Sequence, residues 1–140
     1  MADDSNSLRV RLVTPERILF EHTADAVELP ARNGYMEVLY GHAPLLAELG
    51  AGDVRIHGGT EGEEIYNVSW GFVEVLPDRV TILAQDALRP EEIDVERARQ
   101  QFDRGEQMWK DAGESEEAYT EALRVIAESE AKLATAEEKH

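Results

Sequence analysis

Residues 71–76 and 79–84 read GFVEVL and RVTILA, and only Pro77 and Asp78 separate them. In both segments an apolar side chain recurs at every second position, which places a set of apolar residues on one face of an extended chain. This alternation is typical of a β-strand with one buried face, and Pro and Asp favour a turn. The stretch therefore predicts two strands joined by a short turn.

The same pattern extends back to the N-terminus. Residues 8–13 and 24–29 alternate apolar with polar or charged side chains, and the Asn33-Gly34 pair that follows predicts a hairpin turn. Seven or more short strands, with turn residues at intervals of roughly 8–12 positions, predict an antiparallel sandwich or barrel and no long helix before residue 85. The remaining predicted strands are residues 18–20, 35–39, 53–57 and 64–68.

After Leu88 the apolar period changes from two to about 3.6, the period of an α-helix. Asp94 suits the N-cap of a first helix, Gly113 its end, and Ser115 the N-cap of a second helix. The contact stripes predicted for the two helices are Val95, Ala98, Phe102, Gly105, Trp109 and Ala112, and then Tyr119, Ala122, Leu123, Ile126, Leu133 and Ala134.

The expected fold class is therefore α+β, with a β-sandwich domain over residues 1–88 and an antiparallel helical hairpin over residues 89–140. The alanine-rich contact face of the hairpin lets its helices approach closely but buries little area, so we expect the hairpin to detach easily or to be held by a partner.

Composition excludes several functions. The 140 residues carry 30 Asp plus Glu against 14 Lys plus Arg, a net charge of −16, which repels nucleic acid and anionic membrane surfaces. Adaptation to high salt and ordinary variation in an acidic family both remain open as explanations. There is no cysteine for a disulfide or thiolate site, and residues 1–7 are acidic and polar, unlike a signal peptide, so a cytoplasmic chain without membrane insertion is expected.

Residues that could support catalysis or metal binding do not form recognisable motifs. The four histidines are scattered, and the glycines form no phosphate-binding loop. Ser69 lies near apolar strands but lacks the frame of a nucleophilic serine. We expect neither a catalytic residue nor a metal site.

Residues 33–46 (NGYMEVLYGHAPLL) combine two tyrosines, a histidine and a proline-anchored apolar turn. A projecting loop with these side chains would provide a contact surface, because tyrosine supplies large contact area at small entropic cost. The alternative is that the segment closes one end of the sandwich.

Residues 34–46 resemble the G-x-[LM]-x-[VIL]-[LY]-x-G-H-A-P-L-L segment of the epsilon subunit of bacterial F-type ATP synthases. Three further segments resemble motifs of that family in the same order: residues 70–75 (WGFVEV), 80–84 (VTILA) and 93–98 (IDVERA). The resemblance covers nearly the whole chain.

The resemblance implies a ten-stranded β-sandwich followed by a helical hairpin, in a rotor subunit with no catalytic site. It implies a position on the gamma subunit next to the c-ring, peripheral on the cytoplasmic face of the inner (plasma) membrane, coupling proton flow to ATP synthesis. Tyr35, Tyr40 and His42 are the implied c-ring contacts, with Tyr35 where relatives often carry Glu.

In this family the hairpin can extend along gamma to the catalytic alpha and beta subunits and inhibit hydrolysis, and in some relatives its folded state binds ATP. Asp94, Arg97 and Ala98 match the ATP motif, and Arg104 matches a further basic position. Leu88 and Glu128 depart from the pattern, which has an acid and an Arg there, and Lys132 stands at a second Arg position. The alternative is that Asp94 caps the helix and Arg97 pairs with a nearby acid.

No cofactor is required, and ATP is considered only as a regulatory ligand. The last helix has few bases among many acids, so a weak or salt-dependent inhibitor is expected. A soluble β-sandwich adaptor without an ATPase partner is the alternative function.

Overall fold

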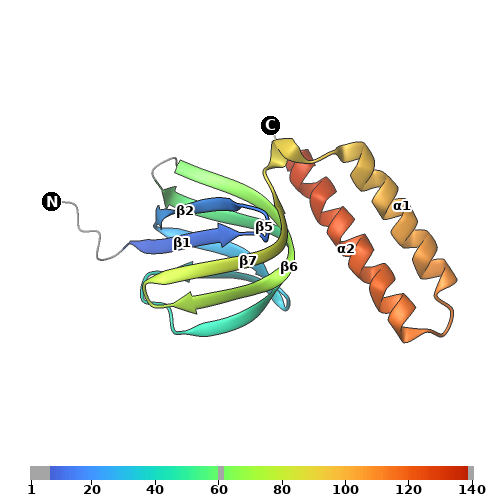
Figure 1. The fold of residues 1–140 in the computed structure, drawn as a ribbon, viewed down its shortest axis with the longest axis horizontal. Helices are drawn as coiled ribbons and strands as arrows, with labels where there is room; N and C mark the ends of the chain where they lie inside the picture. The colour runs from blue at the N-terminus through green and yellow to red at the C-terminus, as the bar shows by residue number, and fades with distance from the viewer. Residues whose placement is uncertain (1–6, 60–61, 139–140) are drawn as a thin grey trace. The chain divides into compact units, whose positions relative to one another are not determined.

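The computed structural model describes residues 7–59 and 62–138. The chain divides into two compact units, Met1–Leu88 and Arg89–His140, which are considered separately (Figure 1). The first unit contains seven strands and the second a short 3₁₀ helix and two α-helices. The elements are β1 (Leu8–Val13), β2 (Ile18–Ala24), β3 (Ala26–Ala31), β4 (Gly34–Leu39), β5 (Leu45–Gly59), β6 (Gly62–Leu76), β7 (Arg79–Leu88), η2 (Pro90–Glu92), α1 (Val95–Asp111) and α2 (Glu116–Glu138).

The strands form one strongly curved sheet in the order β2-β1-β7-β6-β5-β3-β4. All neighbouring strands are antiparallel except β1 and β7, which run parallel. The long strands β5 and β6 bend, so that the sheet folds over and its two halves face each other as in a sandwich (Figure 1). The predicted turn at Pro77 and Asp78 is confirmed, because Leu76 pairs with Arg79. A hairpin turn also follows β3, but it consists of Arg32 and Asn33, and Gly34 pairs with Ala31 as the first residue of β4.

The β-sandwich followed by two helices is confirmed, but the expected count of about ten strands is too high. Segments predicted as separate strands at residues 64–68 and 71–76 are both parts of β6. Trp70 and Gly71 have φ angles of 61° and 130°, which bend the chain without ending the ladder. Pairing with β5 continues on both sides of the bend, because Ser69 pairs with Ala51 and Gly71 with Leu49.

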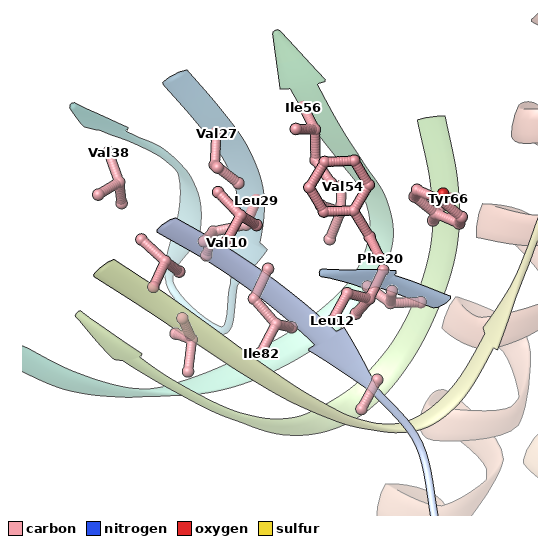
Figure 2. Packing of buried hydrophobic residues seen from close by; sticks show 14 of the residues in the cluster. Val10, Leu12, Phe20, Val27, Leu29, Val38, Val54, Ile56, Tyr66 and Ile82 are labelled. Carbon is pink, nitrogen blue, oxygen red and sulfur yellow. The ribbon is translucent and has the colours of Figure 1, made fainter. Parts of the chain in front are cut away.

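The core lies between the two halves of the curved sheet, where alternating side chains meet (Figure 2). Leu12, Val54 and Ile82 are fully buried and come from three different strands. Tyr66 is also buried, and its hydroxyl donates a hydrogen bond to the carbonyl of Leu19 at 3.2 Å. The period-two pattern therefore marks the inward-facing residues correctly, and the core needs no help from the helices to be continuous.

The predicted helix boundaries of the second unit are confirmed. The Asp94 carboxylate accepts a hydrogen bond from the Arg97 amide at 3.1 Å, and the Ser115 hydroxyl accepts one from the Ala118 amide at 3.2 Å. Between the helices Gly113 adopts φ of 58°, which suits a residue without a Cβ atom just beyond a helix end. Among the described residues, no helix is both long and apolar enough to span a lipid bilayer.

The contact seam of the hairpin differs from the predicted stripes. Small residues are buried in it: Ala98, Gly105 and Ala112 of the first stripe, and Ala122, Ser129 and Thr135 from α2. A Cβ atom on Gly105 would lie 2.8 Å from Cγ1 of Ile126, so the helices are too close for large side chains in the seam.

Several large residues predicted for the stripes lie outside the seam. Trp109, Tyr119 and Leu123 are between 44% and 48% exposed, and the Trp109 and Tyr119 rings lie 6.5 Å apart at the turn end of the hairpin. Ser129 takes a seam position because its hydroxyl donates to the carbonyls of Val125 and Ile126 within its own helix. Its polar atom is thereby satisfied without a partner on α1.

Candidate functional site

The segment with two tyrosines and a histidine is not the single projecting loop that the sequence suggests. Its first part is strand β4, and only residues 40–44 form a turn. Tyr35 and Tyr40 therefore lie at opposite ends of the strand, about 16 Å apart along an extended chain.

Tyr35 is 61% exposed but firmly positioned. Its hydroxyl accepts a hydrogen bond from the Asp53 amide at 2.9 Å, and a Cβ atom on Gly52 would collide with that hydroxyl. Tyr35 pairs with Pro30 across the β3–β4 ladder, so its ring lies over the outer face of the sheet. The side chain presents a fixed aromatic surface.

Tyr40 and His42 lie together in the turn that follows β4. Tyr40 is 45% exposed, and Nδ1 of His42 lies 2.7 Å from the Ala43 carbonyl oxygen, so that ring nitrogen is the donor. The Gly41 amide donates to the Pro77 carbonyl at 2.6 Å, which ties this turn to the β6–β7 turn. The structure thus brings Tyr40 and His42 to one end of the sandwich, without Tyr35.

A row of apolar side chains crosses four strands on the outer face of the sheet, and no pattern in the sequence marks it, because its members come from four separate segments. Phe72 of β6 pairs with Leu83 of β7, Leu83 pairs with Val13 of β1, and Val13 pairs with Ile18 of β2. We call Phe72, Leu83, Val13 and Ile18 the apolar row. Its three larger members are 50–54% exposed.

Charged residues surround the apolar row. Glu48 pairs with Phe72 from the β5 side, and Glu74 lies two residues along β6 on the same face. The row itself carries no charge, whereas other outward positions of these strands, such as Arg11, are ionic. A continuous exposed apolar strip with a charged margin is typical of a protein interface.

In the helical hairpin, the four residues of the resembled ATP motif have different environments. Asp94 caps α1, as one of the two interpretations requires, and Ala98 is buried in the seam. Arg97 and Arg104 are exposed, and neither forms an ion pair with any residue in the described ranges 7–59 and 62–138. The predicted pairing of Arg97 with a neighbouring acid is therefore wrong.

Glu128 of α2 faces the same side of α1 as these arginines. The Gln101 amide donates to the Glu128 carboxylate at 2.6 Å, and Gln101 lies between Arg97 and Arg104 at helical spacing of four and three residues. The Lys132 ammonium lies 3.9 Å from the same carboxylate, and both side chains are at least three-quarters buried. The Glu128 carboxylate thus lies at the margin of the seam, on the side of α1 that carries the two arginines.

Groups that could perform catalysis are not assembled in the described part of the chain. Ser69 is fully buried, and its hydroxyl lacks a hydrogen-bond partner within that part. His57 lies between the carboxylates of Glu28 and Glu63, at 2.5 and 3.0 Å. Among the residues that the structure describes, no group of three or more His, Asp or Glu side chains is arranged so that it could hold a metal ion.

Comparison with known proteins assigns the class of the first unit. A family model described as "ATP synthase, Delta/Epsilon chain, beta-sandwich domain" matches residues 7–90. The sandwich, with its short turns and outer apolar row, is a domain of this class.

Relatives that match most of the chain, including the helical part, identify the family. The chain is 40% identical over 134 residues to the ATP synthase epsilon chain of Solibacter usitatus, covering 96% of this chain and 98% of the relative. It is 43% identical over 110 residues to that of Koribacter versatilis, covering 78% and 76%. The chain belongs to the family of ATP synthase epsilon chains. This favours a part in an ATP synthase over a free-standing β-sandwich adaptor.

The fold also occurs in solved structures at low sequence identity. A chain of the Euglena gracilis mitochondrial ATP synthase, solved with OSCP, F1 and c-ring, matches with a TM-score of 0.77 at 20% identity, covering 92% of this chain and 81% of that one. A chain of the Tetrahymena thermophila mitochondrial ATP synthase central stalk and c-ring matches with a TM-score of 0.66 at 15% identity, covering 92% and 96%. The likeness concerns the fold.

Proposed function

We propose that this chain is a non-catalytic subunit of the ATP synthase central stalk that links the gamma subunit to the c-ring and so couples proton translocation to ATP synthesis. The observation that carries this proposal is the apolar row, whose three larger side chains are half exposed although the core beneath them is fully packed. A permanent partner would remove that surface from water. The stalk would hold the chain as a peripheral subunit on the cytoplasmic face of the inner membrane.

Two surfaces of the sandwich have different chemistry and suit two partners. The apolar row suits gamma, because a lasting contact within a rotor gains most from buried apolar area. The turn with Tyr40 and His42 presents amphipathic and polar groups, which suit the polar loops of the c-ring. Tyr35 offers an aromatic contact at the other end of β4 and is retained as a third c-ring contact.

We propose that the hairpin inhibits ATP hydrolysis weakly and that the strength of this inhibition depends on the salt concentration. In an extended state α2 would approach the alpha and beta subunits with many acids, of which Glu121 and Glu130 are exposed. Carboxylates that meet acidic segments of a partner repel it, and salt screens this repulsion.

Hydrolysis by an epsilon-free catalytic complex tests the function and the inhibition together. The full chain should co-elute with gamma and inhibit weakly, and the E121K/E130K double variant should inhibit roughly fivefold more strongly, because each reversed exposed charge contributes about 0.5 kcal/mol. E37K/E91K makes the same charge change at exposed sites outside α2 and is the control. A chain that does not co-elute with gamma contradicts the proposed function, whereas equal inhibition by all three proteins contradicts only the electrostatic account.

ATP is proposed as a weak regulatory ligand of the hairpin, held by Asp94, Arg97, Ala98 and Arg104. Glu128 opposes it, since a carboxylate near a triphosphate costs about 1 kcal/mol at 4 Å even in water. E128Q keeps a hydrogen-bond acceptor for Gln101 and removes the charge, so it should raise ATP affinity about fivefold in calorimetry. E130Q removes a charge from an exposed position and should leave affinity unchanged. Equal affinities in E128Q and wild type would show that Glu128 does not face the nucleotide.

A further inference from the structure

Arginines gather at one place on the sandwich of this acidic chain. Residues 1–88 contain six arginines and no lysine, and three of them, Arg9, Arg11 and Arg79, line one hollow of about 870 Å³. We call it the arginine hollow. Its wall also includes Tyr40 and the two acids Glu21 and Asp78.

Two of these arginines are immediate neighbours in the sheet. Arg9 of β1 pairs with Arg79 of β7 in the parallel ladder, so both side chains leave the same face of the sheet. Both are exposed. Like charges placed opposite each other on adjacent strands destabilise the pair, and an anion between them removes that cost.

The acids of the hollow leave this pair incompletely neutralised. Glu21 is engaged by Arg11 at 2.9 Å, and Asp78 reaches Nε of Arg79 only at 4.0 Å. The Arg9 side chain forms no ion pair within the described ranges of the chain. Three guanidinium groups thus face two carboxylates, in a chain whose net charge is −16.

The hollow adjoins the surface proposed to face the c-ring. Tyr40 belongs to both the hollow and that surface. The Gly41 amide donates a hydrogen bond to the carbonyl of Pro77, which directly precedes Asp78 and Arg79 in the chain. A protein loop that reaches Tyr40 would therefore also reach Arg9 and Arg79.

We propose that the arginine hollow binds a carboxylate-bearing loop of the partner that faces Tyr40, through Arg9 and Arg79. Guanidinium groups match carboxylates in shape and can bind them with two parallel hydrogen bonds. A protruding acidic loop suits the site better than an anionic membrane does, because the dispersed acids of the chain repel a broad negative surface and affect a narrow loop less. The inference rests on the proposed function, which supplies the partner at this end.

Binding of the full chain to its purified c-ring in detergent, at low and high salt, tests the proposal. R9Q/R79Q should bind the c-ring at least tenfold more weakly at low salt, with a smaller salt dependence, and R9K/R79K should recover part of the affinity. R32Q/R99Q makes the same charge change at exposed arginines that do not line the hollow and should bind as wild type does. Co-elution of every variant with gamma verifies that the sandwich is folded.

The possible results distinguish a failure of the proposed function from a failure of the arginine hollow. If the wild-type chain binds neither gamma nor the c-ring, the proposed function fails. If it binds both and R9Q/R79Q binds the c-ring equally well, only the arginine hollow is refuted. The last experiment measures binding of the chain to vesicles made of equal parts phosphatidylglycerol and phosphatidylcholine. If the wild-type chain binds these vesicles and R9Q/R79Q does not, the hollow binds lipid, and the proposal of a carboxylate-bearing protein loop is overturned.

Discussion

Replacing Gly71 by alanine is expected to lower the free energy of unfolding of the sandwich by about 3 kcal/mol. Gly71 has φ of 130°, a conformation that costs an L-residue about 1–3 kcal/mol. A Cβ atom there would also lie 2.0 Å from the backbone oxygen of Leu83 and 3.0 Å from its carbonyl carbon. Because these are backbone atoms of the neighbouring strand, β6 and β7 would have to separate locally, and their pairing would weaken.

Gly34 provides a matched control for this prediction. Its φ is 133°, and a Cβ atom there would meet nothing within 4 Å. Urea unfolding followed by far-UV circular dichroism should therefore show that G34A loses only the conformational part of about 1–3 kcal/mol, and that its loss is smaller than the loss in G71A. Equal losses in G34A and G71A would mean that the contact with Leu83 has no energetic consequence.

The double substitution F72D/L83D should weaken binding of gamma about 100-fold or more. The two side chains are neighbours in the apolar row, and each is at least half exposed, so the substitution should leave the fold intact. In the complex it would bury two carboxylates in an apolar contact, and a 100-fold loss corresponds to only about 2.7 kcal/mol. Surface-immobilised gamma and soluble full-length chain give the affinity directly.

Leu39 allows the specificity of that effect to be measured. It is 50% exposed and lies at the end of β4, away from the apolar row in the sheet order. L39D introduces the same group at similar exposure and should leave gamma affinity within about twofold. A loss in L39D as large as in F72D/L83D would mean that gamma does not select the row.

The sequence predicts the strands and caps well because local chemistry determines them. Alternation identifies inward residues such as Val80 and Ile82, and Asp94 and Ser115 each cap the helix that follows them. Strand continuity is less predictable, since Trp70 adopts a positive φ that its residue type disfavours. The bend belongs to one continuous strand because residues on both sides of Trp70 pair with β5. Such pairing joins residues far apart in the sequence, so the local sequence does not predict it.

The hairpin seam and the contact surfaces depend on tertiary distance. A stripe of large apolar residues at helical spacing predicts burial, but the close approach at Gly105 admits small residues only. Phe72 and Leu83 were visible as apolar residues in the outward phase of their strands. That they lie side by side in one row follows only from the strand register, in which β6 pairs with β7 and β7 pairs with β1.

The parallel pairing of β1 with β7 has a consequence for how the chain is made. β1 precedes the other strands of the sandwich in the chain and lies between β2 and β7, and Arg17 just before β2 donates a hydrogen bond to the Ala87 carbonyl at 3.2 Å. Each paired residue of β1 has its β7 partner seventy positions later, as Arg9 has Arg79, so this edge of the nascent β1–β2 pair stays unpaired until β7 has been synthesised. Contacts of such long range slow folding and leave a strand edge open to other chains in the meantime. Synthesis of the hairpin begins directly after this last strand, so the sandwich can be completed only as the second unit starts to be made.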